Sequence, residues 1–415
     1  MIDNLKRQLL TLIFLFSLVQ ILNSQIVFSG EVRPRTEFRG GYKTPISKIS
    51  DMAVVTDQRT RLYADYQKSN VKIKITAQDV RVWGNTPTVG GNGSFLGIAE
   101  SWIQIGIKPS IDLTIGRQAI SLDNERIFGA LNWTQAGQFH DAIRLNWRSK
   151  EKSAWRNQLS LIGSVNQSTS VLSQTRFSTK GSYKGLGAAH LSWENTSKGL
   201  QGSLLSSLVL YPTQWHNLWP PSDTHSLTYG IGTHGFTSRF SRGKMRLSFE
   251  GYLQHQTQSK TPEFSGVIAM GKTWDKTTLT VGSDYLSSGF KPLFGTNHKF
   301  YGFMDYFYVG NPHQDKGLFN PYIRMDYSTN AGKFSLFGHH FRSAVNIPTG
   351  QEWLSMGEEI DLLWTKSFSN SIHLLGGWSV MRTTAFTNEI KNTANAPRFQ
   401  TWGFIQLTYK MQAQN

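Results

Sequence analysis

Charged side chains occupy alternate positions in three segments near the N-terminus, and this alternation limits the folds open to the chain. The residues concerned are Glu31, Arg33, Arg35 and Glu37, then Arg59, Arg61 and Asp65, then Lys72 and Lys74. Since successive side chains of a β-strand point to opposite faces, each segment predicts a strand with one charged face and one apolar or neutral face. The fold then depends on whether the charged face meets bulk water outside the molecule or an enclosed aqueous space.

The overall composition favours the enclosed aqueous space. Hydrophobic residues make up only 39% of the 415 residues, whereas aromatic residues reach 13% and glycine numbers 38. Strands of a transmembrane β-barrel are only half apolar, and girdles of aromatic side chains flank their apolar band. Beyond the N-terminal segment, no run approaches the ~20 consecutive apolar residues of a membrane-spanning helix. Because the chain has no cysteine, it forms no disulfide and offers no thiolate ligand to a metal.

The first 24 residues have the layout of a secretory signal peptide. Lys6 and Arg7 precede an apolar run over residues 9–22, and a short polar segment follows it. This run is shorter than the ~20 residues that span a membrane, which favours a cleaved signal over an anchor. We therefore expect cleavage near Ser24 and a mature domain over residues 25–415. An exported chain with a formal charge of +16 predicts anionic lipid or an acidic solute, and not nucleic acid, as its partner.

Segments with a period of two recur along the whole chain. We predict about eighteen strands, at 27–38, 56–67, 70–82, 97–108, 110–120, 138–149, 154–166, 183–195, 199–211, 224–239, 243–257, 263–274, 277–288, 317–328, 332–345, 356–368, 371–385 and 397–411. Short polar links such as 68–70 and 275–276 alternate with longer ones such as 121–137 and 289–316. An outer-membrane barrel has this arrangement, with an even number of strands, short periplasmic turns and longer external loops. The predicted fold is therefore all-β, a transmembrane antiparallel up-and-down β-barrel.

Several short motifs match known sites but lie in the wrong context. Residues 266–273 match the phosphate-loop pattern and residues 230–235 match G-x-G-x-x-G, yet both lie in predicted strands with no helix after them. His339 and His340 are adjacent, which places their rings on opposite strand faces, a poor geometry for a metal. A membrane lipase requires a Ser–His pair with an orienting group, and sequence alone aligns no such pair. We expect no catalytic site, no metal and no cofactor.

One stretch of the sequence indicates more than the fold class. Residues 116–129, which begin Gly116-Arg117-Gln118 and include Asn124-Glu125-Arg126, continue into 132–135 and 139–145 and resemble the signature of the alginate export family of outer-membrane proteins. Residues 58–62 and 298–305 resemble further blocks of that family. The chain departs from the family pattern at His140 and in its C-terminus, which continues past Tyr409. The resemblance implies an eighteen-stranded barrel with an arginine-lined constriction that passes an acidic polysaccharide.

The alternation also predicts which charged side chains face the lumen. Basic residues on the predicted wet face are Arg33, Arg35, Arg59, Arg61, Lys74, Arg144, Arg246 and Arg324, and Arg117 and Arg126 lie at a strand end and in the following loop, from which they could turn into the pore. A ring of such groups in a narrow pore attracts anions, and the planar fork of arginine suits carboxylates. Acidic residues on the same face are Glu31, Glu37, Asp65, Glu250, Asp326, Glu359 and Asp361. We expect them to pair with some of the arginines and hold them in position.

Together these features predict a passive outer-membrane channel for anionic solutes, with acidic oligo- or polysaccharides as the expected cargo. Two alternatives remain open. A general porin for small solutes would keep its ion selectivity when Arg59 and Arg61 are both replaced by alanine. An outer-membrane enzyme such as a lipase would show turnover as a purified protein.

Overall fold

The computed structural model describes residues 26–89, 96–150, 153–167, 183–212, 228–257, 259–296, 298–307, 316–344, 354–393 and 395–411. The predicted signal peptide lies outside these residues. Within them, no helix is long and apolar enough to cross a membrane.

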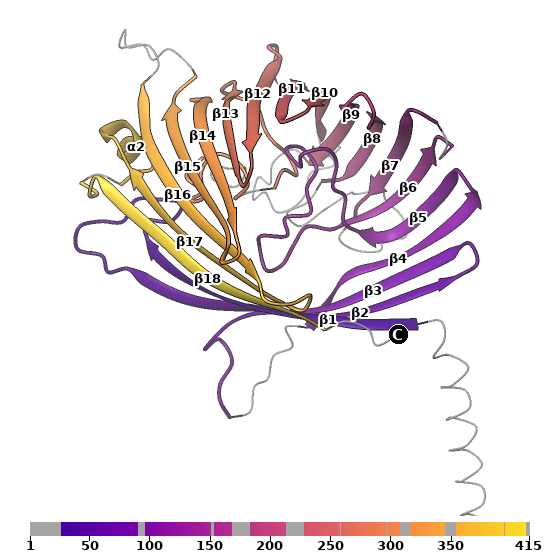
Figure 1. Ribbon diagram of the computed structural model, residues 1–415, viewed down its shortest axis with the longest axis horizontal. Coiled ribbons are helices and arrows are strands. Elements are labelled where there is room, and N and C mark those ends of the chain that lie inside the picture. The colour runs from indigo at the N-terminus through magenta and orange to yellow at the C-terminus, as the bar shows by residue number, and fades with distance from the viewer. Residues whose placement is uncertain are drawn as a thin grey trace, which may run out of the picture.

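Eighteen antiparallel strands form one closed barrel (Figure 1). Each strand pairs with its neighbours in the sequence, and β1 also pairs with β18, for example Glu37 with Phe404, which closes the ring. The strands are β1 (Ile26–Gly40), β2 (Ala53–Lys68), β3 (Val71–Val82), β4 (Leu96–Lys108), β5 (Ile111–Gln118), β6 (His140–Arg148), β7 (Arg156–Val165), β8 (Gly185–Asn195), β9 (Leu200–Pro212), β10 (Thr228–Arg242), β11 (Met245–Gln256), β12 (Glu263–Trp274), β13 (Thr277–Leu286), β14 (Leu318–Thr329), β15 (Gly332–Arg342), β16 (Ser355–Ser367), β17 (Ile372–Arg382) and β18 (Phe399–Met411). The predicted fold class is confirmed.

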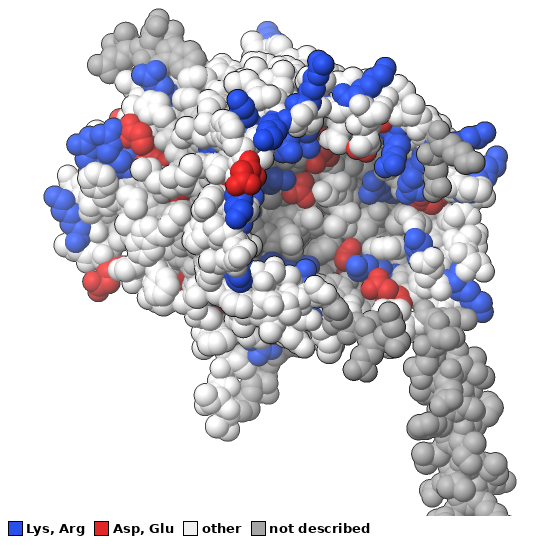
Figure 2. Space-filling view, viewed as in Figure 1, with Lys and Arg blue, Asp and Glu red and all other residues white. Residues whose placement is uncertain are grey.

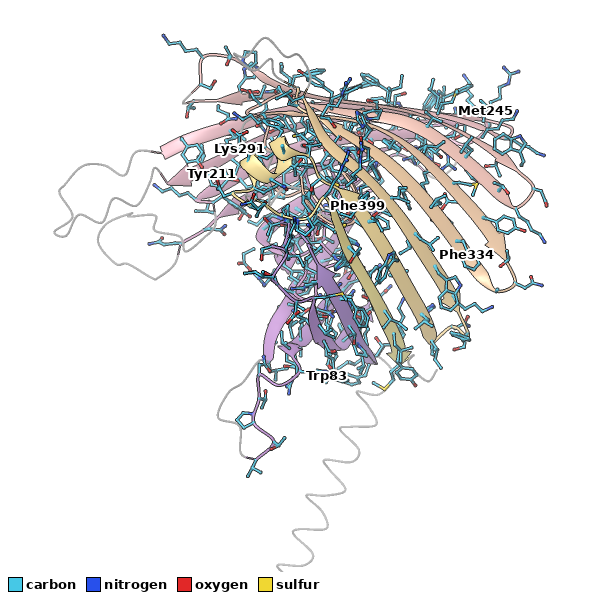
Figure 3. The ribbon with its side chains drawn as sticks, turned by 90° about the vertical axis from the view of Figure 1, so that its left-hand side faces the viewer. Trp83, Tyr211, Met245, Lys291, Phe334 and Phe399 are labelled. Carbon is cyan, nitrogen blue, oxygen red and sulfur yellow. The ribbon has the colours of Figure 1, made fainter. Side chains whose placement is uncertain are left out.

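The connections differ between the two ends of the barrel. The end at which β1 begins has tight turns such as 69–70, 109–110 and 275–276, and we call it the short-turn end. The other end has longer connections such as 119–139 and 287–317, and we call it the long-loop end. Figure 3 shows Met245 and Phe334 towards one end of the barrel, with Tyr211 and Lys291 towards the other. Gly199 is required in one tight turn because a Cβ atom there would lie 1.8 Å from the carbonyl oxygen of Ser241.

Apolar side chains cover the outside of the barrel. Along β2, Leu62 on the outer face is 57% exposed, whereas Arg61 beside it in the sequence is 8% exposed. The same alternation leaves Ile75, Phe236 and Leu362 exposed on other strands. An apolar outside with polar groups inside is the reverse of a soluble protein and matches a barrel in lipid.

The buried core lies inside the ring and comes largely from two long connections. Residues 119–139, between β5 and β6, form the first lumen loop, and residues 287–307, after β13, form the second lumen loop. Phe128 of the first pairs with Phe294 of the second in an isolated β-bridge, and the Trp133 ring stacks on His298 with centroids 3.8 Å apart. Figure 1 shows the first lumen loop within the ring of strands. A short helix, α2 (Ala385–Ile390), follows β17 and packs against β16.

Candidate functional site

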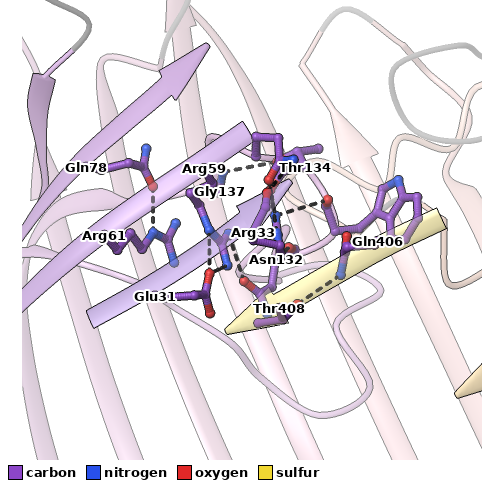
Figure 4. Close-up of polar contacts among 12 residues, drawn as sticks. Glu31, Arg33, Arg59, Arg61, Gln78, Asn132, Thr134, Gly137, Gln406 and Thr408 are labelled. Atoms are coloured by element: carbon purple, nitrogen blue, oxygen red, sulfur yellow. Dashed lines mark hydrogen bonds and ion pairs between the residues drawn. The ribbon is translucent and has the colours of Figure 1, made fainter. Parts of the chain in front are cut away.

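Four arginines on the neighbouring strands β1 and β2 stand in two adjacent rows inside the barrel. Figure 4 shows three of them, Arg33, Arg59 and Arg61. Arg33 and Arg35 alternate with outward residues on β1, Arg59 and Arg61 do so on β2, and Arg33 is directly opposite Arg59 in the strand register. We call this set the arginine ladder. All four side chains turn inward as predicted, yet their exposure is only 1–8%.

The first lumen loop covers Arg33 and Arg35, the two ladder arginines of β1. Arg33 donates hydrogen bonds to the carbonyl oxygen of Asn132 at 2.7 Å, to that of Thr134 at 2.9 Å and to the side chain of Gln135 at 2.8 Å. Arg35 donates to the carbonyl oxygen of Trp133 at 2.9 Å and lies 4.3 Å from the centroid of its ring. Because these guanidinium donors already serve loop carbonyls, this part of the ladder holds the loop in place.

The predicted acidic partners fix the remaining ladder contacts. Glu31 accepts from Arg59 at 2.5 Å. Glu37 accepts from Arg39 at 2.9 Å and forms an ion pair with Arg35 at the same distance. Arg61 donates to Gln78 at 2.6 Å and to the carbonyl oxygen of Ala136 at 3.4 Å. The expected pairing of acids with arginines is therefore present. Arg35 and Arg59 are ion-paired, whereas Arg33 and Arg61 donate to neutral oxygens, so the ladder is a clamp whose donors are occupied and not an open cationic surface.

Arg126 anchors the first lumen loop to the opposite wall. Its guanidinium donates to Asp284 on β13 at 2.6 Å and lies 3.1 Å from Glu250 on β11. It also donates to the hydroxyl of Tyr301 at 3.1 Å and lies 4.0 Å from the ring centroid of Phe300, both on the second lumen loop. Burial opposes its charge, but the adjacent carboxylates raise the pKa of Arg126 well above its ordinary value. Arg126 thus stays charged and ties both lumen loops to the wall.

Of the other predicted lumen cations, all but one turn inward. Arg144 bonds to Asn146 at 3.0 Å, Arg324 pairs with Asp326 at 2.8 Å, and Lys74 lies 3.9 Å from Asp65. Arg246 lies opposite Gly271 on the inward face of its strand.

The prediction that Arg117 turns into the pore is wrong. The alternation of β5 continues without a break to Gln118, so Arg117 shares the outer face with Ile115. Arg117 pairs there with Asp141, which is 64% exposed. It does not turn into the pore as expected.

Open space in the lumen lies on both sides. A space of about 520 Å³ lies beside Arg35 and Glu37 on the ladder side, and two further spaces lie against β6 to β15. One of these two, a chamber of about 520 Å³ against β10 to β15, contains eight cations and two carboxylates in its lining, and the cations are Arg126, Arg239, Lys244, Arg246, Lys276, Lys299, Arg324 and Lys333. The described residues place no carboxylate within 4 Å of the charged nitrogens of Arg239, Lys244, Arg246 or Lys276. A second space of about 860 Å³ shares Arg239, Asn124 and Ser248 with this chamber. Its lining is more balanced in charge, because it adds three cations, Arg148, Lys150 and Arg156, and three carboxylates, Asp123, Glu194 and Glu250. Figure 2 shows one face of the molecule hollowed at its centre, with Lys and Arg gathered around the hollow.

The sequence predicted only part of this chamber. Arg246 and Arg324 were expected, whereas Arg239 was not, although it follows Gly235 and Thr237 on the same face of β10 and the period of two would have found it. Lys244 and Lys276 lie in or beside tight turns, where alternation gives no direction. Lys299 lies on the second lumen loop, and no local pattern indicates that this loop folds inward.

Two predicted lumen acids, Glu359 and Asp361, turn inward but pair with no lysine or arginine of the described residues. Glu359 accepts from the backbone N–H of Met304 at 2.7 Å, so it holds the second lumen loop. Neither carboxylate oxygen of Asp361, which is fully buried, accepts a hydrogen bond within the described chain, and its nearest charged partner is His339 at 3.7 Å. No group of three or more acidic or histidine side chains among the described residues is placed to hold a metal ion.

The described residues form no complete Ser–His–carboxylate triad of the kind that a lipase requires. Ser367 lies 2.8 Å from Nδ1 of His373, but the other ring nitrogen of His373 meets the backbone carbonyl of Asn370 and not a carboxylate. His190 lies 2.8 Å from Asp123, with no serine hydroxyl bonded to its ring in this part of the chain.

Comparison with known protein families supports the resemblance found in the sequence. The model of the family described as "Alginate export" matches residues 24–197. The resemblance predicted from the sequence is confirmed over this stretch, and the predicted block at 298–305 lies outside it. The matched stretch includes both strands of the arginine ladder and the first lumen loop. No curated protein matches the chain.

Solved structures with the same fold are outer-membrane proteins. The outer membrane protein OpdK of Pseudomonas aeruginosa matches with a TM-score of 0.60 and 9% identity, over 94% of this chain and 99% of that one. OccK2 (OpdF) of P. aeruginosa, solved in complex with glucuronate, matches with a TM-score of 0.56 and 12% identity, over 93% and 96%. OccAB2 of Acinetobacter baumannii matches with a TM-score of 0.56 and 14% identity, over 94% and 98%. The chain thus has an outer-membrane porin-like channel fold.

Proposed function

We propose that the protein is a passive outer-membrane channel for anionic solutes, with acidic oligo- or polysaccharides as its cargo. The observation that carries this proposal is the chamber against β10 to β15, in which cations outnumber carboxylates by eight to two. Such a surplus inside low-dielectric walls attracts anions and repels cations. The apolar outer face and the N-terminal signal-like segment support a location in the outer membrane.

The two sides of the lumen have different roles in this proposal: the ladder side holds the first lumen loop, and the chamber side binds the solute. On the ladder side, the arginines hold the first lumen loop across the barrel and thereby narrow the passage. On the chamber side, Arg239 and Arg246 present donors that no carboxylate of the described chain occupies, so a passing carboxylate can accept from a planar guanidinium fork. Arg324 and Lys333 share Asp326, which lies 3.1 Å from the Lys333 ammonium and limits how tightly a solute binds.

The comparisons support the same solute class. One structural neighbour was solved with glucuronate and another, OpdK, with vanillate, and both ligands carry a carboxylate. The matched family is described by alginate export, and alginate is an acidic polysaccharide.

Ion selectivity in planar bilayers tests the proposal. Wild-type protein in a salt gradient should give a reversal potential of the sign set by anion flow, and Arg239→Gln with Arg246→Gln should move it towards zero. Arg242→Gln is the matched control, because Arg242 pairs with Met245 and lies on the outer face of the same strand as Arg239. A cation-selective wild type, or no conductance at all, would contradict the proposal.

The alternatives give different results in the same preparation. A general porin would show the same weak selectivity with and without Arg239 and Arg246. The ladder is unsuited to this comparison, because Arg59 is 1% exposed and its replacement would disturb the loop as well as the charge. A lipase would hydrolyse ester substrates.

A further inference from the structure

Basic side chains on the outer face of the barrel have carboxylate partners at one end of the barrel and lack them at the other. At the long-loop end, outward arginines have carboxylate partners: Arg81 with Asp79 at 2.7 Å, Arg117 with Asp141 at 3.2 Å and Arg382 with Glu358 at 2.5 Å. Each of these cations is therefore neutralised by the protein itself.

The outward cations at the short-turn end lack such partners. Four of them lie on strands whose register sets their direction, and we call them the basic rim: Lys68, Arg242, Lys272 and Lys366. Lys68 pairs with Val71, Arg242 and Lys272 both pair with Met245, and Lys366 pairs with Leu374, all on the outer face. Within the described ranges, none has a carboxylate oxygen within 4 Å. Lys366 instead donates to the backbone carbonyl of Asn330.

The basic rim lies at the edge of the apolar outer surface. The ammonium of Lys272 lies 5.4 Å from the ring centroid of Trp274, which is 41% exposed on the same face. Trp364 precedes Lys366 by two residues on the outer face of β16. Aromatic rings with adjacent cations mark the depth at which lipid headgroups begin. The rim charges therefore lie where lipid phosphates lie.

We propose that the basic rim binds the phosphate groups of anionic phospholipids in the leaflet at the short-turn end. Cations held near a membrane surface without protein counter-charges attract anionic lipid. A docked acidic protein fits less well, because the rim residues come from β2, β10, β12 and β16, which are spread around the ring. Lipid surrounds a barrel on all sides, whereas one partner covers one side. The inference rests on the membrane location in the proposed function and is independent of the solute.

Quenching of tryptophan fluorescence by brominated lipid tests the inference. Because the chain has 13 tryptophans, the signal of Trp274, beside Lys272, is taken as the difference between each protein and its Trp274→Phe version. Wild-type protein is placed in vesicles of phosphatidylcholine mixed with brominated phosphatidylglycerol, and then in the mixture with the bromine on phosphatidylcholine instead. We expect rim sites to prefer phosphatidylglycerol about five-fold, the effect of one cation near an anionic surface. Added salt should reduce this preference, because it screens charges exposed at the interface.

Two variants separate the rim from general charge effects. The first replaces all four rim residues with glutamine and should lose most of the preference. The control replaces Arg81, Arg117 and Arg382 with glutamine and should keep it, since these cations are already paired. Equal quenching by both brominated lipids in the wild type, or an unchanged preference in the rim variant, would overturn the inference. If the rim variant does not fold, the salt dependence of the wild type decides, because a preference that salt leaves unchanged also overturns it. Failure of the channel proposal would appear separately, as absent conductance from protein that still inserts into vesicles.

Discussion

Arg126 is the side chain whose loss should disturb the lumen most. It is 6% exposed, and it is shared by Glu250 and Asp284, which are 8% and 3% exposed. Replacing it with glutamine leaves two buried carboxylates on β11 and β13 without their cation. Removing one partner from a buried ion pair costs about 3–5 kcal/mol.

The cost should appear first as release of the lumen loops, because the strands keep their own hydrogen bonds. Since each 1.4 kcal/mol changes an equilibrium constant tenfold, release should become more favourable by about a hundredfold to a few thousandfold. The first and second lumen loops should move together, because Arg126 also contacts Tyr301 and Phe300. We expect a larger and noisier conductance in single-channel recordings, with faster proteolysis at the long-loop end.

A rescue variant distinguishes loss of charge balance from loss of shape. Arg126→Gln combined with Glu250→Gln and Asp284→Asn removes the stranded charges and should recover much of the quiet conductance. Arg382→Gln is the control, because its guanidinium is 40% exposed and pairs with Glu358 on the outer face of the barrel, away from the lumen. Such exposed pairs contribute about 0–1 kcal/mol. An Arg126→Gln channel with wild-type conductance and protease resistance would refute this account of the lumen loops.

Two further predictions concern stability. Asp361→Asn should raise the melting temperature at pH 8. Asp361 is fully buried beside the acidic side chain of Glu359, so a neutral amide in its place should stabilise the fold by about 1–3 kcal/mol. An unchanged or lower melting temperature, with Glu358→Gln as the outer-face control, would contradict this. Burial lowers the pKa of Lys391, at the end of α2, to about 8. Its ammonium is therefore disfavoured in the folded protein, and stability should rise with pH between about 8 and the ordinary lysine range near 10.4. Lys391→Met should flatten that rise in thermal melts, and an equal rise in both proteins would show that other groups cause it.

The strands were predictable because their signal is local. The alternation from Glu31 to Glu37 or along β12 (Glu263–Trp274) lies within one segment, and the predicted bounds of β12 agree with the structure. Bounds shifted where a different local element competes. The predicted strand 371–385 ends at Arg382 because Thr384 caps α2 by accepting from the N–H of Thr387.

The burial of the lumen residues was not predictable, since it depends on contacts far apart in the sequence. Alternation places Arg33 inside, but it says nothing of the carbonyl of Asn132, 99 residues away, which takes its donor. The ladder was therefore expected to meet the solute, and it meets a loop instead. Arg126 was expected to turn inward, yet only the fold shows that its guanidinium donates a hydrogen bond to Asp284, 158 residues away.

The reversal potential of the wild-type channel tests the central claim most directly. With the cation-lined chamber as the path of the solute, a salt gradient should give a potential of the anion-selective sign, and Arg239→Gln with Arg246→Gln should reduce it while Arg242→Gln does not. A potential of the cation-selective sign, or one that the double variant leaves unchanged, would contradict the claim that these chamber cations select the solute.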